Sequence, residues 1–338
     1  MRAMKTPSDS KKSSSEHVLP TNIVPAKVSF VDVDDDQAGQ RIDNFLMARL
    51  KGVPKSKVYN IIRKGEVRVN KGRTKPDYKI SVGDEIRIPP VRVTEKEAVP
   101  KPSNTMTVLL ENSVLFENDG LLVINKPPGL AVHGGSGVSL GLIETLRQMR
   151  PDARYLELIH RLDRDTSGCI MIAKKRSMLR HLQAALREKS FSGITKVYHA
   201  LVIGHWPQTC KRVDAPLLKV EVADDERVVR VHPDGKPSLT EFKILQCYSN
   251  CSLIEARPIT GRTHQIRVHA RHVGHSLVGD EKYGDDDFNK QMRDVGVKRL
   301  FLHAAELGFY LPDATEKTIV KAPLAKDLAA ALKKLVPI

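Results

Sequence analysis

The apolar residues near the middle of the chain fall into two short runs that flank a charged segment. Leu156, Leu158 and Ile159 precede this segment, and Cys169–Ile172 follows it. Short apolar runs beside turn-forming residues are typical of buried strands. The segment between them, His160–Gly168, carries two carboxylates and two guanidinium groups. Because burying the ends of a charged loop costs free energy unless the charges pair or act, we expect chemistry here, although a solvated turn gives the same pattern.

The N-terminal part of the chain shows a helical pattern followed by a strand pattern. Apolar residues recur at helical spacing within Arg41–Leu50, and Ser56 is a suitable N-cap for a second short helix. Alternating apolar residues in Glu66–Asn70 and Asp84–Pro89 predict two strands. These elements predict a small α/β module.

The later part of the chain contains more predicted strands than helices. The strands and helices do not alternate in strict βαβ order, which favours an α+β domain with a mixed, mainly antiparallel sheet. Together with the N-terminal pattern, this divides the chain into four parts. They are a disordered basic tail (1–38), a small α/β module (39–90), a linker (91–106) and a large α+β domain (107–338).

Length, charge and cysteine spacing indicate the class of protein and its partner. The chain has 338 residues, a net charge of +15 and no apolar run long enough to span a membrane, so we expect a polyanionic partner and no membrane insertion. The Ser- and Lys-rich start has no apolar core of a secretory signal. The four cysteines form no CxxC pair, and we interpret them as free thiols of a cytoplasmic protein: Cys169, Cys210, Cys247 and Cys251.

The excess positive charge is concentrated in the small module. Residues 51–80 contain ten basic and two acidic side chains, a net charge of +8. A charge run is usually only a solvated face, but on so small a module we favour a footprint for the phosphate backbone of nucleic acid. The basic residues are Lys51, Lys55, Lys57, Arg63, Lys64, Arg68, Lys71, Arg73, Lys75 and Lys79.

A second charged cluster lies at Thr260–His269. If a helix begins at Thr263, then His264 and Arg267 share one face, and Arg267 is able to reach a carboxylate of another segment. An aspartate beside a guanidinium stays ionised, as a nucleophile or base requires. A structural ion pair explains the same residues equally well.

Three further features are weaker. The histidines of this region, His264, His269, His272 and His275, suggest a metal, but no HExxH pattern is present and we expect none. Tyr198 shares a strand face with Lys196, which by itself is typical of a core tyrosine. The segment Val278–Gly284, which contains Asp280, resembles a structured turn with no evident catalytic role.

Several motifs in one order make the chain similar to the RluA-type pseudouridine synthases, and among them to the ribosomal large-subunit enzymes of the C type. Residues 39–46 (GQRIDNFL) and 50–56 (LKGVPKS) point to the C type, and Arg41–Pro90 also resembles the S4 RNA-binding domain. The remaining motifs are NKPPGLAVHGGSG (125–137), HRLDRDTSG (160–168), KVYHALV (196–202), GKPSLTEFK (235–243) and TGRTHQIRVH (260–269).

The resemblance implies isomerisation of uridine to pseudouridine in large-subunit (23S) ribosomal RNA by a monomer without cofactor or metal. It assigns the catalytic nucleophile to Asp163 and not to Asp165, between which the residues alone do not decide. It places Tyr198 against the target base and Arg267 in an ion pair with Asp163. Arg161 resembles the arginine that replaces a flipped-out base. The implied RNA-binding residues are Arg161, Lys55, Lys57, Arg63, Lys64, Arg68, Lys71, Arg73, Arg262 and His264.

Two other functions fit parts of the pattern. One is a non-catalytic RNA-binding or ribosome-assembly protein with the same fold, against which the complete set of Asp163, Tyr198 and Arg267 argues. The other is a base-excising glycosidase, which needs a second carboxylate to activate water, and Asp165 is the one nearby candidate. Whether the carboxylate would add to the sugar or remove its 2′ proton is open.

Overall fold

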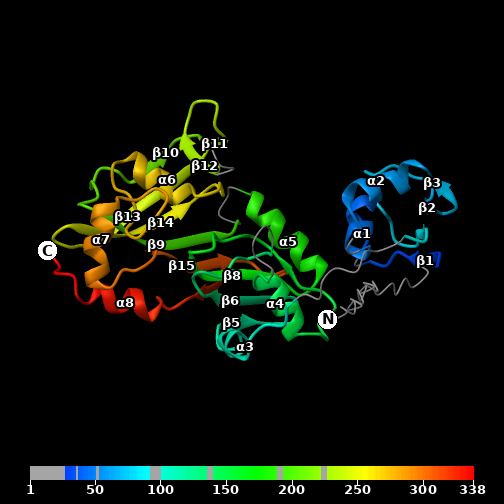
Figure 1. Cartoon of the computed structure of the whole chain (residues 1–338), viewed down its shortest axis with the longest axis horizontal. Helices are drawn as coiled ribbons and strands as arrows, with labels where there is room; N and C mark the ends of the chain where they lie inside the picture. Colours follow the sequence, from blue (N-terminus) through cyan, green and yellow to red (C-terminus); the bar gives the residue numbers. More distant parts are fainter. Residues whose placement is uncertain are drawn as a thin grey trace, which may run out of the picture. The chain divides into compact units, whose positions relative to one another are not determined.

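The computed structural model describes residues 27–35, 37–50, 53–91, 100–134, 140–188, 193–221 and 227–338. The chain divides into two compact units, Met1–Glu97 and Ala98–Ile338 (Figure 1). Each unit has its own sheet. No helix in the described parts of the chain is long and apolar enough to cross a membrane.

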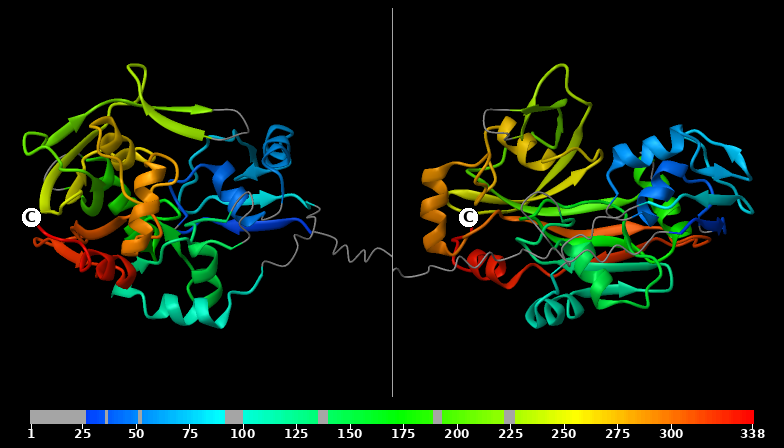
Figure 2. Two further views of the ribbon diagram at one scale, coloured as in Figure 1. Left: turned by 60° about the vertical axis from the view of Figure 1, so that its left-hand side comes forward. Right: turned by 45° about the vertical axis from the view of Figure 1, so that its right-hand side comes forward.

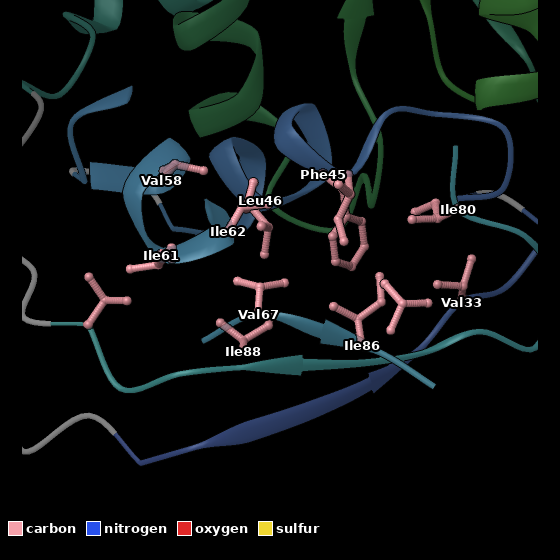
Figure 3. Packing of buried hydrophobic residues seen from close by; sticks show 13 residues of the cluster. Val33, Phe45, Leu46, Val58, Ile61, Ile62, Val67, Ile80, Ile86 and Ile88 are labelled. Carbon is pink, nitrogen blue, oxygen red and sulfur yellow. The ribbon is translucent and has the colours of Figure 1, made fainter. Parts of the chain in front are cut away.

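The first unit packs two helices against a four-stranded sheet of order β1-β4-β2-β3. Phe45 and Leu46 of the first helix and Ile61 and Ile62 of the second lie against the strands, and all four are buried (Figure 3). The apolar side of each helix therefore faces the sheet, as the helical spacing of the apolar residues predicts. The elements are β1 (Ser29–Asp32), α1 (Ile42–Arg49), α2 (Lys55–Arg63), β2 (Arg68–Val69), β3 (Gly72–Arg73) and β4 (Glu85–Ile88).

Three expected boundaries in and beside this unit are wrong. The tail predicted to reach residue 38 includes β1, which pairs antiparallel with β4 and thereby completes the sheet. The second helix begins at Lys55 after Pro54, because the fixed φ of proline suits a helix start; Ser56 is not its N-cap. The predicted linker ends in a helix that is capped by the Ser103 hydroxyl. Residues 1–26 of the tail and 92–99 of the linker lie outside the described residues.

The second unit is built on a ten-stranded sheet whose main path runs β10-β13-β14-β9-β15-β8-β6-β5. β16 pairs with β15, and β7 pairs with β8. All the pairings are antiparallel except β8–β15, so the predicted α+β class with a mixed, mainly antiparallel sheet is confirmed. The strands are β5 (Val114–Glu117), β6 (Leu121–Lys126), β7 (Glu157–Leu158), β8 (Ser167–Ala173), β9 (Thr195–Ile203), β10 (Arg212–Asp214), β11 (Leu217–Glu221), β12 (Arg227–Val231), β13 (Leu239–Cys247), β14 (Cys251–Pro258), β15 (Leu302–Phe309) and β16 (Thr318–Lys321).

Helices cover both faces of this sheet. On β8, Ile170 and Ile172 pack with Leu146 of α4, whereas Met171 packs with Leu182 of α5. Because successive strand residues point to opposite faces, α4 and α5 lie on opposite sides of the sheet. The β11–β12 hairpin is a separate two-stranded sheet that packs beside α6 (Figure 2). The helices are α3 (Asn104–Glu111), α4 (Leu142–Met149), α5 (Arg176–Arg187), α6 (Gln265–His272), α7 (Asp286–Val295) and α8 (Lys326–Leu332).

Candidate active site

The charged loop His160–Gly168 lies between β7 and β8, and the prediction of two strands around it is confirmed. The loop is tied back to its own strand, because the Met171 N–H donates to His160 Nε2 at 3.1 Å. Burial lowers the pKa of His160 to about 4, and the imidazole is therefore neutral at pH 7 and able to accept this bond. The loop thus starts from a fixed position at the sheet.

The end of the loop is fixed by an unusually close approach of β8 to β15. Gly168 has a φ of +109°, and a Cβ at this position would clash with the backbone of Ala304, its carbonyl oxygen above all. Next to it, Ser167 Oγ lies 2.9 Å from Nδ1 of the buried His303 on β15. A side chain at Gly168 would separate the two strands and displace the loop.

Lys126, at the end of β6, bonds to the charged loop. It was not among the predicted site residues. Its Nζ donates to the carbonyl oxygens of Pro127, Leu130 and Arg164, each at 2.9 Å. Burial lowers its pKa to about 7, whereas Asp165 and Asp163 act in the opposite direction. Three acceptors match the three N–H groups of an ammonium ion, so the lysine joins β6 to the loop.

A cleft of about 790 Å³ opens over this loop. Asp163 and Tyr198 line it, with Arg267 and His264 on the side of α6. The Asp163 side chain is 33% exposed and can therefore meet a ligand in the cleft. Tyr198 lies on β9 between its neighbours on β14 and β15, and burial raises its pKa, so its hydroxyl stays protonated. The structure thus brings together the three residues that the resemblance selected.

Arg267 contacts two carboxylates, and the principal one was not predicted. Its Nε and Nη2 both donate to Asp280 at 2.7 Å, whereas its Nη1 lies 3.5 Å from Oδ2 of Asp163. Burial lowers the pKa of Arg267, but the bonds to Asp280 more than offset this, and its pKa is raised. Asp280 is itself buried and accepts the backbone N–H groups of Lys282 and Tyr283. The expected ion pair between Arg267 and Asp163 is present, and the two bonds to Asp280 hold the guanidinium of Arg267 in place.

The helix that carries Arg267 begins two residues later than predicted. Its N-cap is His264, with φ of +53°, and Thr263 lies before it. Gln265 fixes this start, because its Oε1 accepts bonds from the Thr260 hydroxyl and the Arg262 N–H. His264 Nε2 still lies 3.9 Å from Oδ2 of Asp163, so the two basic side chains converge on the same oxygen.

The two carboxylates of the loop differ in their surroundings. Asp165 is 49% exposed and pairs with Arg164 at 3.3 Å, on the surface. Arg161 is exposed and lines the cleft beside Asp163. Arg262 also lines the cleft, and its Nε donates to the carbonyl of Pro237. Of the two carboxylates of the loop, Asp163 is the one that lines the cleft and approaches Arg267 and His264.

The histidines considered as metal ligands have other contacts. His269 is fully buried and lies within hydrogen-bond distance of Ser238, Thr240 and the Ala215 carbonyl. His275 bonds to the Ile203 carbonyl. In the described parts of the chain, no group of three potential ligands could hold a metal ion.

The basic residues assigned to RNA binding in the first unit are all exposed. Among the described residues, no ion pair joins any of them to a carboxylate, so their charges are available to a phosphate backbone. Lys51, which belongs to the same run, lies outside the described residues, as do residues 135–137 of the glycine-rich motif. The exposed residues are Lys55, Lys57, Arg63, Lys64, Arg68, Lys71 and Arg73.

Comparison with known proteins identifies the class of enzyme. Residues 120–272 match the family model for RNA pseudouridylate synthase, and residues 40–86 match the S4 domain. A ribosomal large subunit pseudouridine synthase C of Vibrio cholerae serotype O1 is 53% identical over 317 residues, covering 93% of this chain and 99% of the relative. The chain belongs to the RNA pseudouridine synthases. The synthase is similarly 53% identical to the ribosomal large subunit pseudouridine synthase C of Escherichia coli K12, over 91% of its own length and 97% of the relative.

Solved structures agree with this assignment. The synthase superposes on human RNA pseudouridylate synthase domain containing 4 with a TM-score of 0.57 and 26% identity, covering 68% of this chain and 95% of the human one. For human RNA pseudouridylate synthase domain containing 1, the TM-score is 0.54 at 26% identity, with 72% and 92% covered. Its fold is therefore that of a pseudouridine synthase with an S4 domain at the N-terminus.

Proposed function

We propose that this synthase converts uridines of large-subunit (23S) ribosomal RNA to pseudouridine, acting as a cytoplasmic monomer. Its relatives carry the name ribosomal large subunit pseudouridine synthase C, and the basic surface of the S4 domain suits a phosphate backbone. In this proposal Met1–Glu97 binds RNA, with residues 39–90 as its S4 domain, and Ala98–Ile338 carries out the chemistry.

The reaction breaks the N1–C1′ bond, turns the retained uracil and joins C5 to C1′. Atoms are conserved and no electron is gained or lost, so the reaction consumes no co-substrate and no redox partner. Asp163 acts as the nucleophile or base at the sugar, and Arg267 Nη1 lies 3.5 Å from its Oδ2. Tyr198 packs against the target base. Water that enters the cleft would divert the intermediate to hydrolysis, so the bound RNA must close the cleft.

Access to Asp163 requires the uridine to leave its stacked position in the RNA. Unstacking costs a few kcal/mol, which an inserted side chain and backbone contacts offset. Arg161, exposed at the mouth of the cleft, takes the place of the base. Arg262 and His264 contact the RNA from the side of α6, and the seven basic residues of the S4 domain hold its backbone.

One observation carries this proposal: the carboxylate of Asp163 faces an open cleft while its Oδ2 lies 3.5 Å from Arg267, an arginine whose side chain is only 11% exposed. Replacing Asp163 with Asn keeps the shape and removes the charge. We expect Asp163→Asn to lose pseudouridine formation by at least about 10³-fold, with RNA affinity changed less than about threefold. Single-turnover conversion of ribosomal RNA fragments and filter binding measure the two effects.

Asp165→Asn is the matched control, because Asp165 is exposed and pairs only with Arg164 among the described residues. We expect it to keep near-normal conversion. Retained turnover in Asp163→Asn would refute the assignment of the nucleophile. Release of free uracil by the wild-type enzyme would favour a glycosidase, and RNA binding without any conversion would favour an assembly protein.

A further inference from the structure

His264 takes part in a series of contacts, two hydrogen bonds and one longer approach, that leads from the β11–β12 hairpin to Asp163. The backbone N–H of Val229 donates to the Tyr283 hydroxyl oxygen at 3.0 Å, and this oxygen lies 2.7 Å from His264 Nδ1. On the other side of the ring, Nε2 lies 3.9 Å from Oδ2 of Asp163. These contacts connect an element outside the main sheet to the proposed nucleophile.

The direction of these bonds fixes the tautomer of His264. A backbone N–H can only donate, so the Tyr283 oxygen is the acceptor for Val229. The oxygen has a second lone pair, but among the described residues His264 Nδ1 is the acceptor recorded for the buried Tyr283 O–H, so this O–H is satisfied when it donates to an unprotonated Nδ1. In a neutral imidazole the proton therefore lies on Nε2, the nitrogen that faces Asp163. Burial lowers the pKa of His264, which keeps the ring neutral, although Asp163 acts in the opposite direction.

The contacts of Asp163 distinguish its two oxygens. Arg267 Nη1 at 3.5 Å and His264 Nε2 at 3.9 Å both approach Oδ2. Contacts from two side chains to the same oxygen restrict rotation of the carboxylate. Oδ1 has neither of these two contacts. The distances are long for hydrogen bonds, as is common in free enzymes whose contacts tighten when substrate binds.

We propose that His264 is a positioning residue for the reaction: its Nε2–H holds Oδ2 of Asp163 so that Oδ1 faces the sugar, and Tyr283 sets the tautomer that makes this possible. The inference rests on the proposed nucleophilic role of Asp163.

The backbone and the neighbouring ring support this role. His264 is held at φ +53° and ψ +20°, a left-handed conformation that non-glycine residues adopt infrequently and that occurs often at functional sites. Tyr283 is 2% exposed, and the Arg267 guanidinium lies 4.9 Å from the centre of its ring. Tyr283 therefore contacts both of the basic side chains that converge on Oδ2.

The tautomer can be observed directly. Long-range ¹H–¹⁵N spectra of the full-length protein with ¹⁵N-labelled histidine distinguish Nε2–H from Nδ1–H, and the signals of His264, among twelve histidines, are those lost in His264→Gln. We expect the Nε2–H form at neutral pH in the wild type, and a mixture of forms in Tyr283→Phe. An Nδ1–H ring or an imidazolium in the wild type would overturn the inference.

Two amide variants separate positioning from other roles. The Gln side chain can place an N–H near the position of Nε2, whereas the Asn side chain can only keep an acceptor near Nδ1 for Tyr283. Loss of a hydrogen bond to a charged group costs on the order of tenfold or more in rate. We therefore expect His264→Asn to lower the single-turnover rate about tenfold or more and His264→Gln to lower it less than about threefold.

RNA affinity and thermal unfolding complete the test. Both variants lose the imidazole ring and with it any contact of the ring with RNA, so we expect their two dissociation constants to agree within about twofold, with melting temperatures unchanged from the wild type. Equal rates for Asn and Gln, or a loss that follows the dissociation constant, would show an RNA contact or a structural role instead. An inactive wild-type enzyme would refute the proposed function and leave the tautomer result unaffected.

Discussion

Gly168 sets the distance between the charged loop His160–Gly168 and strand β15 beside it. Its φ of +109° and the clash that a methyl group would make with the Ala304 carbonyl exclude every residue with a Cβ. The strands cannot give way easily, because Ser167 and His303 are bonded at the same place and both are buried. Because glycine has only a hydrogen atom as its side chain, β8 and β15 can approach closely at Gly168, and this close approach helps to hold the loop that carries Asp163.

We expect Gly168→Ala to lower the free energy of unfolding by about 3–5 kcal/mol, because the strain of the positive φ adds to the clash with β15. Urea unfolding monitored by circular dichroism measures this loss. Gly274→Ala is the matched control, since Gly274 also has a positive φ (+91°) but nothing lies within 4 Å of an added Cβ. It should lose only about 1–2 kcal/mol. Similar losses in both variants would refute the role of close strand packing.

The hydrogen-bond partners of Arg267 and Lys126 could not be predicted from sequence patterns. The motif around Arg267 indicated the residue, but Asp280 reaches it only through the geometry of a tight turn that has no periodic pattern. Lys126 donates to three backbone carbonyls, one of them 38 residues away, and every residue carries a carbonyl. The one available signal was a lysine that ends the apolar run of β6 directly before two prolines.

At the scale of elements, local patterns predicted the strands around the charged loop and the two helices of the first unit, because apolar spacing reflects which face is buried. Helix starts were less accurate. Ser56 is a good cap by type, but the helix already begins at Lys55 after Pro54, and the start of α6 after His264 depends on the contacts of Gln265. Strand β1 was missed because it completes the sheet at its edge with only four residues.

The exposed basic residues of α2 and β2 allow a test of the RNA-binding surface. Replacing Arg63, Lys64 and Arg68 with Gln should weaken RNA binding and reduce the slope of log affinity against log salt by about 2–3, since each lost phosphate contact removes about 0.7–0.9. The single-turnover rate at saturating RNA should not change. Titrations at several salt concentrations give the slope.

A control of equal charge is available on α8 and the residues after it. Lys326, Lys333 and Lys334 are exposed and lie in the other unit, so their replacement with Gln removes the same charge from a surface not assigned to RNA. An equal reduction of the slope in both triple variants would mean that overall charge, and not the S4 surface, determines binding.

At the scale of the whole molecule, each unit has its own hydrophobic clusters among the described residues. The core of the first unit draws its buried residues from between Val33 and Val91, and the cores of the second begin at Leu110. Each core is sufficient to stabilise its own sheet. RNA binding and chemistry are therefore assigned to parts of the chain that can fold separately.

We expect a protein consisting of Ala98–Ile338 to fold and to unfold cooperatively on heating, because its described hydrophobic clusters are made of its own residues. Its RNA affinity should fall, with a smaller salt slope than that of the full chain. Circular dichroism melting and salt titrations measure the two properties. A chain that melts without cooperativity would contradict the separation of the units.

The parallel pairing of β8 with β15 also has a consequence for biosynthesis. Ser167 and His303 are separated by 136 residues, so the strand that supports the catalytic loop is translated long after the loop itself. Contacts of this sequence separation form only when both segments are free to meet. A nascent chain that already contains Asp163 and β8 therefore lacks β15, the parallel partner of β8, until β15 has left the ribosome. The enzyme becomes competent only after β15 has been synthesised, which leaves time for the S4 domain to fold first.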